Sequence, residues 1–170
     1  MKRFLILICA AFMTIGVSAQ DYYYYESEGP ESGDWALGFG LNLGFGAGVT
    51  NFGIQVPRVQ YYFASRVRAE FGFNYYFKNK EITDWNVDLD IHPYIIPIVY
   101  GMHVYPVVGL TFWHRRYSDL DQNIGRVGAN VGAGFQYDIT EKISANLQYK
   151  YMITNEYSHN VFNIGMSYRF

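Results

Sequence analysis

The chain has 170 residues, enough for one domain with a sizeable core. Aromatic residues (19%) exceed charged residues (16%), a balance that favours β-strands, and the 17 glycines argue against long helices. The formal charge of −2, without a basic run or a nucleic-acid-binding motif, excludes an electrostatic case for nucleic acid. The four histidines lack the spacing of metal ligands, so we expect no metal and no cofactor.

The first segment has the pattern of a secretory signal. The positive residues MKR precede the apolar stretch FLILICAAFMTIGV and the small residues that a signal peptidase requires. We predict that residues 1–19 are a cleaved signal peptide. A retained transmembrane helix is the alternative, but the apolar run is shorter than the roughly 20 residues that span a bilayer. The single cysteine, Cys9, lies in this segment, so the mature chain has no disulfide.

Residues 20–34, QDYYYYESEGPESGD, combine a run of tyrosines with acids, glycine and proline. We interpret them as a flexible leader in front of a single domain over residues 35–170. A tyrosine patch that binds a partner or lies at a membrane interface is the alternative, and the sequence leaves both open.

From residue 35 onward, large apolar residues alternate with small or polar ones. A period of two predicts strands, since a helix would place apolar residues at a period of 3.6. Eight segments show the pattern: 35–45, 52–63, 67–77, 85–94, 102–114, 127–137, 143–153 and 160–170. In the second segment the apolar positions change parity at Pro57, which predicts a β-bulge or a late strand start.

The connections between these segments differ in length. Short turns are predicted over 64–66, 96–101 and 138–142. Longer, more polar loops are predicted over 46–51, 78–84, 115–126 and 154–159. Short turns at one end and longer loops at the other are typical of an antiparallel up-and-down meander.

The character of the two faces indicates a membrane protein. An eight-stranded barrel has an interior just wide enough for side chains, so the bulky apolar face is predicted to face lipid and the small, polar face to line the lumen. A soluble barrel would be apolar inside. A soluble sandwich with the glycine and asparagine face as its surface remains an alternative. About 11 residues, tilted by ~40°, rise roughly 28 Å, close to the ~25 Å apolar band of such barrels.

We therefore predict an all-β fold, an eight-stranded antiparallel up-and-down transmembrane β-barrel. An open sheet edge in hydrocarbon would leave peptide groups unpaired at several kcal/mol each. The last strand must then pair with the first, which explains the regular alternation in VFNIGMSYRF at the C-terminus.

The barrel assigns side chains to two regions. Aromatic residues near strand ends fit interfacial girdles: Trp35, Tyr75, Phe77, Tyr137 and Tyr151. The polar residues predicted to line the lumen are Arg58, Gln60, Arg68, Glu70, Asp88, Asp90, His92, Gln136, Lys150 and Arg169. Because buried charges are tolerated only when paired, we expect an ion-pair network with Arg68 and Glu70 beside Asp88 and Asp90. A polar pathway for ions is the alternative.

Several stretches together resemble small outer-membrane β-barrels of the OmpA/OmpX type, the outer membrane protein beta-barrel domain family. They are WALGFGLNLGFG, PRVQYYFASRVRAEFGFNYYF, VYPVVGL and GAGFQYDITEKISANLQYKY, followed by the terminal Tyr168-Arg169-Phe170. The resemblance covers residues 35–170 and implies the outer membrane of a Gram-negative-type envelope, with its lipid as a partner. It also implies that Tyr168 and Phe170 are the C-terminal signal for the assembly machinery.

The residue types of a serine hydrolase occur in two loop segments. They are Tyr157-Ser158-His159 and His114 with Ser118 and Asp119. Neither matches a known motif, and solvated loops account for both, so we assign no catalytic residue and predict a protein that is not an enzyme. His103 is interpreted as a residue at a strand start.

Three functions remain in order of preference. The first is a non-enzymatic barrel with a structural role or with an external ligand at the four longer loops. The second is a small ion or solute channel, which needs a water-filled lumen. The third is an enzyme acting on outer-membrane lipid, which needs His114 or His159 and a nearby serine.

Overall fold

The computed structural model describes residues 30–46, 49–79, 82–99, 101–117, 122–155 and 158–170. The predicted signal peptide and most of the predicted leader lie outside these residues. The described chain forms nine strands: β1 (Trp35–Gly46), β2 (Val49–Ala64), β3 (Val67–Asn79), β4 (Ile82–His92), β5 (Ile96–Val99), β6 (Met102–Tyr117), β7 (Gln122–Asp138), β8 (Ile143–Thr154) and β9 (His159–Arg169). Within the described ranges, no helix is long and apolar enough to cross a membrane.

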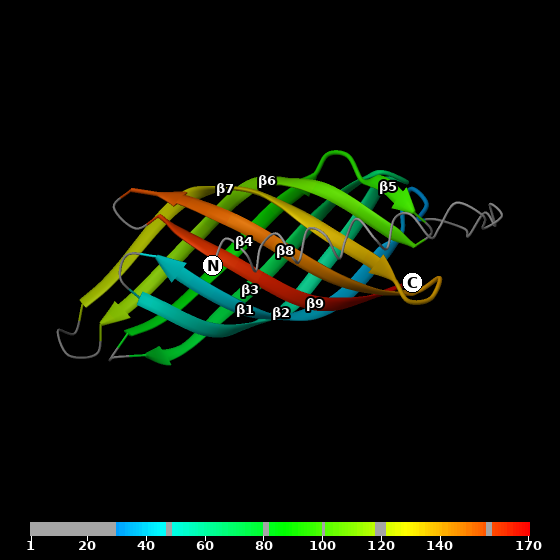
Figure 1. The fold of residues 1–170 in the computed structure, drawn as a ribbon. Helices are drawn as coiled ribbons and strands as arrows, with labels where there is room; N and C mark the ends of the chain where they lie inside the picture. The colour runs from blue at the N-terminus through cyan, green and yellow to red at the C-terminus, as the bar shows by residue number, and fades with distance from the viewer. Residues whose placement is uncertain (1–29, 47–48, 80–81, 100, 118–121, 156–157) are drawn as a thin grey trace, which may run out of the picture.

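The strands close into a barrel (Figure 1). The order is β4-β3-β2-β1-β9-β8-β7-β6-β5, and the additional pairing of β4 with β6 closes the sheet. Every pairing is antiparallel, so β1, β2, β3, β4, β6, β7, β8 and β9 form the predicted eight-stranded antiparallel barrel. The C-terminal strand β9 pairs with both β1 and β8, which confirms the predicted closure.

The short strand β5 was not predicted. It follows β4 after residues 93–95 and pairs with the start of β6, with Ile96 opposite Val104. The sequence predicted a turn over 96–101. The hairpin to β6 is instead confined to the residues after Val99, because the backbone of 96–99 still finds hydrogen-bond partners on β6.

The parity change in β2 is a bulge. Val56 and Pro57 both point outward, and the β2–β3 register shifts between Gln55 and Arg58. The β1–β2 register shifts between Gly38 and Gly40, beside the same point. The extra residue keeps the apolar positions on both sides of Pro57 facing outward.

The four predicted longer loops are shorter than expected. β1 and β2 are separated by residues 47–48, β3 and β4 by 80–81, β6 and β7 by 118–121, and β8 and β9 by 155–158. Most of these connecting residues lie outside the described ranges, so only the flanking parts of the predicted loops can be corrected. The strands extend into the predicted loops because their backbone hydrogen bonds continue beyond the apolar part of the barrel wall. In these extensions the sequence no longer alternates between apolar and polar residues, so the alternation did not predict them as strands. The end of the barrel with these connections is called the hairpin end below, and the opposite end the termini end.

The distribution of polar and apolar residues is inverted relative to a soluble protein. Ile164 and Leu110 expose 63% and 61% of their surface on the outside, whereas Arg58 and Asn86 are fully buried inside. The apolar cluster of the interior is small and contains Ala36, Tyr62, Ile95, Tyr105 and Val107. The barrel therefore buries polar side chains in its lumen and presents its apolar side chains to the surroundings.

Candidate functional site in the lumen

The inward faces of the strands gather polar side chains in the lumen. All of the predicted lumen residues are buried except Arg169. Arg169 lies at the termini end, where it forms an ion pair with Asp34 at 3.4 Å and donates a hydrogen bond to the carbonyl of Glu141. It therefore belongs to the rim of the barrel rather than to the interior.

Lys150 is the centre of an interior cluster of charged and amide side chains. Its Nζ, supplied by β8, lies 2.6 Å from Asp88 Oδ2 and 2.8 Å from Asp90 Oδ2 on β4. Asn74 donates to Asp88 Oδ2 at 3.0 Å, and Asn130 donates to Asp90 Oδ1 at 2.8 Å. Lys150 thus crosses the lumen and joins two walls of the barrel that are not neighbours in the sheet.

A second ion pair forms nearby between β2 and β3. Arg58 Nε lies 2.9 Å from Glu70 Oε2, and Gln60 Nε2 donates to the same oxygen at 2.7 Å. Arg58 also donates through Nη1 to Asn163 Oδ1 of β9 at 3.2 Å. This cluster ties the first half of the barrel to its closing strand.

The contacts of Arg68 differ from the predicted ion pairs with carboxylates. It donates to His92 Nδ1 at 2.7 Å, to the Tyr62 hydroxyl at 2.8 Å and to Gln136 Oε1, and its guanidinium lies 4.6 Å from the centre of the Tyr105 ring. Among the described residues, its hydrogen-bond partners are neutral. The carboxylates of β4 are held by Lys150 from across the lumen instead.

Cross-strand register explains this difference. Arg68 lies directly opposite the neutral His92 and not opposite a carboxylate, whereas Glu70 lies opposite Asp90, so that β3 and β4 place two like charges side by side. The compensating cations come from strands that the linear sequence does not identify as neighbours of β4. Pairing within one hairpin could be predicted from sequence, but contacts across the lumen could not.

Two charged lumen residues were assigned to loops by the sequence analysis. Asp84 and Arg115 are buried near the hairpin end, and Arg115 Nε and Nη2 each lie 2.7 Å from one oxygen of Asp84. Continuing the alternation of 86–90 and 111–113 by two residues would have placed both on the inward face. With them, the buried charges are Arg58, Arg68, Arg115 and Lys150 against Glu70, Asp84, Asp88 and Asp90.

Large rings in the lumen were also not assigned to the site. Tyr62, Tyr76, Tyr105 and Trp113 are each 3% exposed or less. They fit because small residues lie opposite: an added Cβ at Gly134 would lie 2.2 Å from the ring of Tyr105. The lumen is therefore filled by rings over glycines as well as by ion pairs.

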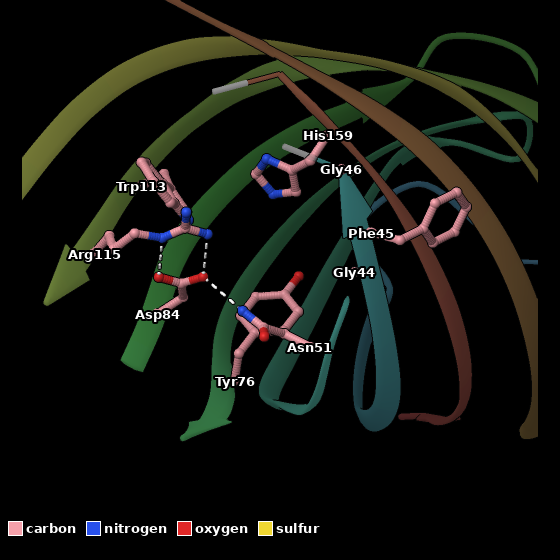
Figure 2. A pocket seen from close by; sticks show the side chains of 9 residues that line it. All are labelled: Gly44, Phe45, Gly46, Asn51, Tyr76, Asp84, Trp113, Arg115 and His159. Carbon is pink, nitrogen blue, oxygen red and sulfur yellow. Dashed lines mark hydrogen bonds and ion pairs between the residues drawn. The ribbon is translucent and has the colours of Figure 1, made fainter. Parts of the chain in front are cut away.

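The hairpin end of the lumen contains a small pocket (Figure 2). Asn51 donates to Asp84 Oδ2 at 2.8 Å, and the guanidinium of Arg115 lies 4.6 Å from the centre of the Trp113 ring. The free volume is about 20 Å³, and the lining residues are Gly44, Phe45, Gly46, Asn51, Tyr76, Asp84, Trp113, Arg115 and His159. A second pocket of about 20 Å³ lies at the termini end, beside Tyr62, Gln136 and Arg169.

Those residues considered for catalysis that the structure describes, His114, Ser158 and His159, do not form a catalytic arrangement. His114 stacks on the outward ring of Trp85 at 5.1 Å, and Ser158 donates its hydroxyl to the Thr154 carbonyl at 3.1 Å. His159 lies at the pocket, with its ring 5.9 Å from Trp113. Ser118, Asp119 and Tyr157 lie outside the described residues.

Other residues named from sequence lie at the two ends of the barrel. His103 is the second residue of β6, 3.4 Å from Asp138, and no group of three or more potential metal ligands occurs in the part of the chain described. Of the aromatic residues that the sequence analysis named, Trp35, Tyr137, Tyr168 and Phe170 are exposed at the termini end, and Tyr75, Phe77 and Tyr151 are exposed toward the hairpin end. The amide of Phe170 donates to the Trp35 carbonyl at 2.9 Å.

A closed antiparallel barrel with an apolar exterior and a charged, hydrogen-bonded interior is the structure of a membrane-spanning β-barrel. The chain belongs to the family described as "Outer membrane protein beta-barrel domain", whose match covers residues 7–170. The protein is therefore an integral protein of the outer membrane, as its sequence pattern predicted. No curated protein matches the chain.

Solved structures of small outer-membrane proteins share the fold. Ail of Yersinia pestis has a TM-score of 0.60 at 14% identity, over 82% of this chain and 99% of Ail. Neisserial surface protein A (NspA) has a TM-score of 0.64 at 12% identity, over 81% of this chain and 96% of NspA. OprG of Pseudomonas aeruginosa has a TM-score of 0.56 at 15% identity, over 84% of this chain and 98% of OprG. At these identities the likeness concerns the fold alone.

Proposed function

We propose that this protein is a non-enzymatic outer-membrane barrel with a lumen plugged by side chains, which stabilises the envelope and contacts outside partners at its hairpin end. The observation that carries the proposal is the bridge from Lys150 to Asp88 and Asp90 across the lumen. A pore would need this cross-section to contain water, whereas here it contains an ion pair with 3% or less of each side chain exposed.

The remainder of the interior supports a plug. Arg58 with Glu70 and Arg115 with Asp84 form further ion pairs between different strands. A permeating ion would have to break these contacts and leave charged groups unpaired in a low-dielectric interior. We therefore rank the channel second and the lipid-modifying enzyme third.

The hairpin end is the part that we infer to meet partners. Both described ends of the chain lie at the opposite end, near Trp35 and Phe170. We assign that end to the periplasmic side, from which a secreted chain reaches the outer membrane. A structure of Ail is described in complex with the heparin analogue sucrose octasulfate, so one barrel of this shape binds a carbohydrate-like molecule. We propose that residues 46–51, 78–84, 115–126 and 154–159 form the corresponding contact region here.

The C-terminal strand has a separate role in this proposal. Phe170 is 61% exposed and Tyr168 44% exposed on the outer surface of the closing strand. Their side chains are therefore available to the outer-membrane assembly machinery before the barrel inserts into lipid. We propose them as the signal that this machinery recognises.

Conductance tests the plugged lumen directly. The mature protein is refolded into a planar bilayer, and folding is verified by heat-modifiable migration on gels and by the circular dichroism of β-structure. We expect no stable openings under conditions in which a porin of larger strand number conducts. Stable unit openings from folded protein would contradict the plug and make Lys150, Asp88 and Asp90 selectivity residues of a channel.

A further inference from the structure

Asn51 and Tyr76 both line the hairpin-end pocket, and Asn51 Oδ1 is buried there without a hydrogen-bond partner among the described residues. Asn51 is 5% exposed and uses its amide nitrogen on Asp84, but its Oδ1 accepts no hydrogen bond. Tyr76 is 3% exposed, and its hydroxyl makes no hydrogen bond within the described part of the chain. Buried polar groups are normally paired, so the unpaired oxygen of Asn51 in a pocket that Tyr76 also lines favours a further polar group at this place.

The charges beside these groups are already neutralised. Each oxygen of the Asp84 carboxylate accepts a hydrogen bond from Arg115, and Oδ2 also accepts one from Asn51 (Figure 2). The ion pair closes one wall of the pocket and presents no net charge to it. A ligand that fits here is therefore neutral, and it is recognised by an amide oxygen and a phenol.

The shape of the pocket limits the size of the group that enters. The free volume of about 20 Å³ holds one hydroxyl-sized group, since a single water molecule needs roughly 10–15 Å³ by the same measure. Glycines keep this space open: an added Cβ at Gly44 would lie 3.2 Å from the ring of Tyr76, and one at Gly46 would lie 2.7 Å from Cβ of His159. The rings of Tyr76 and Trp113 provide flat walls around it, and the polar imidazole of His159 lies beside them (Figure 2).

We propose that this pocket anchors a terminal hydroxyl or hydroxymethyl group of a neutral saccharide. A sugar hydroxyl both donates and accepts, so it can donate to Asn51 Oδ1 while accepting from the Tyr76 hydroxyl. The remainder of the sugar lies outside the pocket. The inference rests on the proposed function in that the hairpin end faces outward. The sugar can belong to a free saccharide or to the lipopolysaccharide of the surrounding membrane.

Trp113 provides a reporter for the test. The other tryptophans, Trp35 and Trp85, lie outside the lumen, so a W35F/W85F protein reports on the pocket through Trp113 alone. This protein is placed in phosphatidylcholine nanodiscs, because alkyl glycoside detergents carry the headgroup under test. It is titrated with the methyl α-glycosides of glucose, galactose and mannose.

We expect a saturable change in fluorescence with at least one of the three glycosides. Tyr76→Phe removes a hydroxyl that has no described partner, so the barrel should fold and bind the glycoside about 3- to 10-fold more weakly. Tyr105→Phe is the matched control, because the Tyr105 hydroxyl is also unpaired but lies in the apolar cluster at the other end of the lumen. Its affinity should equal that of the parent protein.

The result that overturns the inference is equally specific. The inference is wrong if none of the three glycosides binds, if Tyr76→Phe and Tyr105→Phe bind alike, or if inorganic phosphate saturates the signal in place of the glycosides. Nanodiscs that contain lipopolysaccharide separate the sources: a signal already saturated there identifies the membrane sugar, and an unsaturated signal identifies a free saccharide. A silent conductance record would leave the plugged barrel supported even if the saccharide site failed.

Discussion

At the residue scale, Lys150 resolves a conflict that the strand register creates. Glu70 and Asp90 lie directly opposite each other on β3 and β4, where like charges destabilise a sheet. Lys150 reaches Asp88 and Asp90 from β8, and Arg58 reaches Glu70 from β2. Asp88 and Asp90 are therefore neutralised from across the lumen, whereas Glu70 is neutralised by a residue of the neighbouring strand β2.

Lys150→Ala tests this arrangement. The variant leaves two carboxylates buried without their cation, and breaking a buried pair from one side costs about 3–5 kcal/mol. We expect the free energy of unfolding in urea, measured in lipid vesicles, to fall by that amount. Lys150→Met should lose nearly as much, since it restores the volume of the side chain but not its charge.

The matched control for this experiment is Lys142→Ala. Lys142 is exposed in the turn between β7 and β8, where its backbone carbonyl, not its side chain, accepts a hydrogen bond from Arg169. The free energy of unfolding of the Lys142→Ala variant should stay within about 0.5 kcal/mol of that of the parent protein. Equal stabilities for Lys150→Ala and Lys142→Ala would show that the lumen contacts do not stabilise the barrel.

At the element scale, the bulge in β2 sets which side chains of that strand face lipid. Val56 and Pro57 point outward in succession, and Gln55 and Arg58 on either side point inward. A strand has a side-chain period of two, so one residue more or less exchanges the faces of everything beyond it. The bulge is therefore required for Phe52, before it, and Tyr61, after it, to lie on the same outer face of the sheet.

Deletion of Pro57 tests the role of the bulge. The shortened strand must place either its apolar residues in the lumen or Arg58 and Gln60 in lipid, so we expect the yield of heat-modifiable, folded barrel to collapse. Pro57→Val keeps the number of residues and should fold with nearly the parent yield. A deletion variant that refolds as well as Pro57→Val would contradict the assigned register.

The ends of the strands show where sequence reasoning stops at this scale. The alternation identified all eight barrel strands, because the lipid-facing side of each is apolar over its spanning part. It did not identify the last residues of β6 (16 residues) or the first residues of β7 (17 residues), where polar residues occur on both faces. Asp84 and Arg115 were missed for this reason, and the hairpin-end pocket with them.

At the scale of the whole molecule, the apolar exterior places the barrel in the bilayer. Ile164 of β9 is 63% exposed and is flanked by Leu41 and Leu147, each midway along its own strand. Such a residue faces the middle of the hydrocarbon layer. The outer surface, rather than a buried core, is therefore where apolar side chains leave water.

The substitution Ile164→Arg measures how much the apolar outer surface contributes to the stability of the barrel in lipid. An arginine at the bilayer midplane of a barrel costs about 2–4 kcal/mol, whereas the same change near an interface costs about 0–1 kcal/mol. Ile153→Arg provides the comparison, since Ile153 is 48% exposed near the hairpin end of β8. We expect urea unfolding in vesicles to separate the two variants, and equal losses would place the membrane midplane elsewhere on the barrel.

The sequence by itself determined the class of this protein. Alternation with a period of two, bulky residues on one face and small or polar residues on the other are local properties, and together they require a closed barrel in lipid. Which lumen residues touch depends on curvature and closure, which bring β8 against β4 and β6 against β1 without any local signal. The partners of Lys150, the neutral contacts of Arg68 and the pocket between Asn51 and Tyr76 were decided by the tertiary structure, because contacts across the lumen join strands that are distant in the sequence.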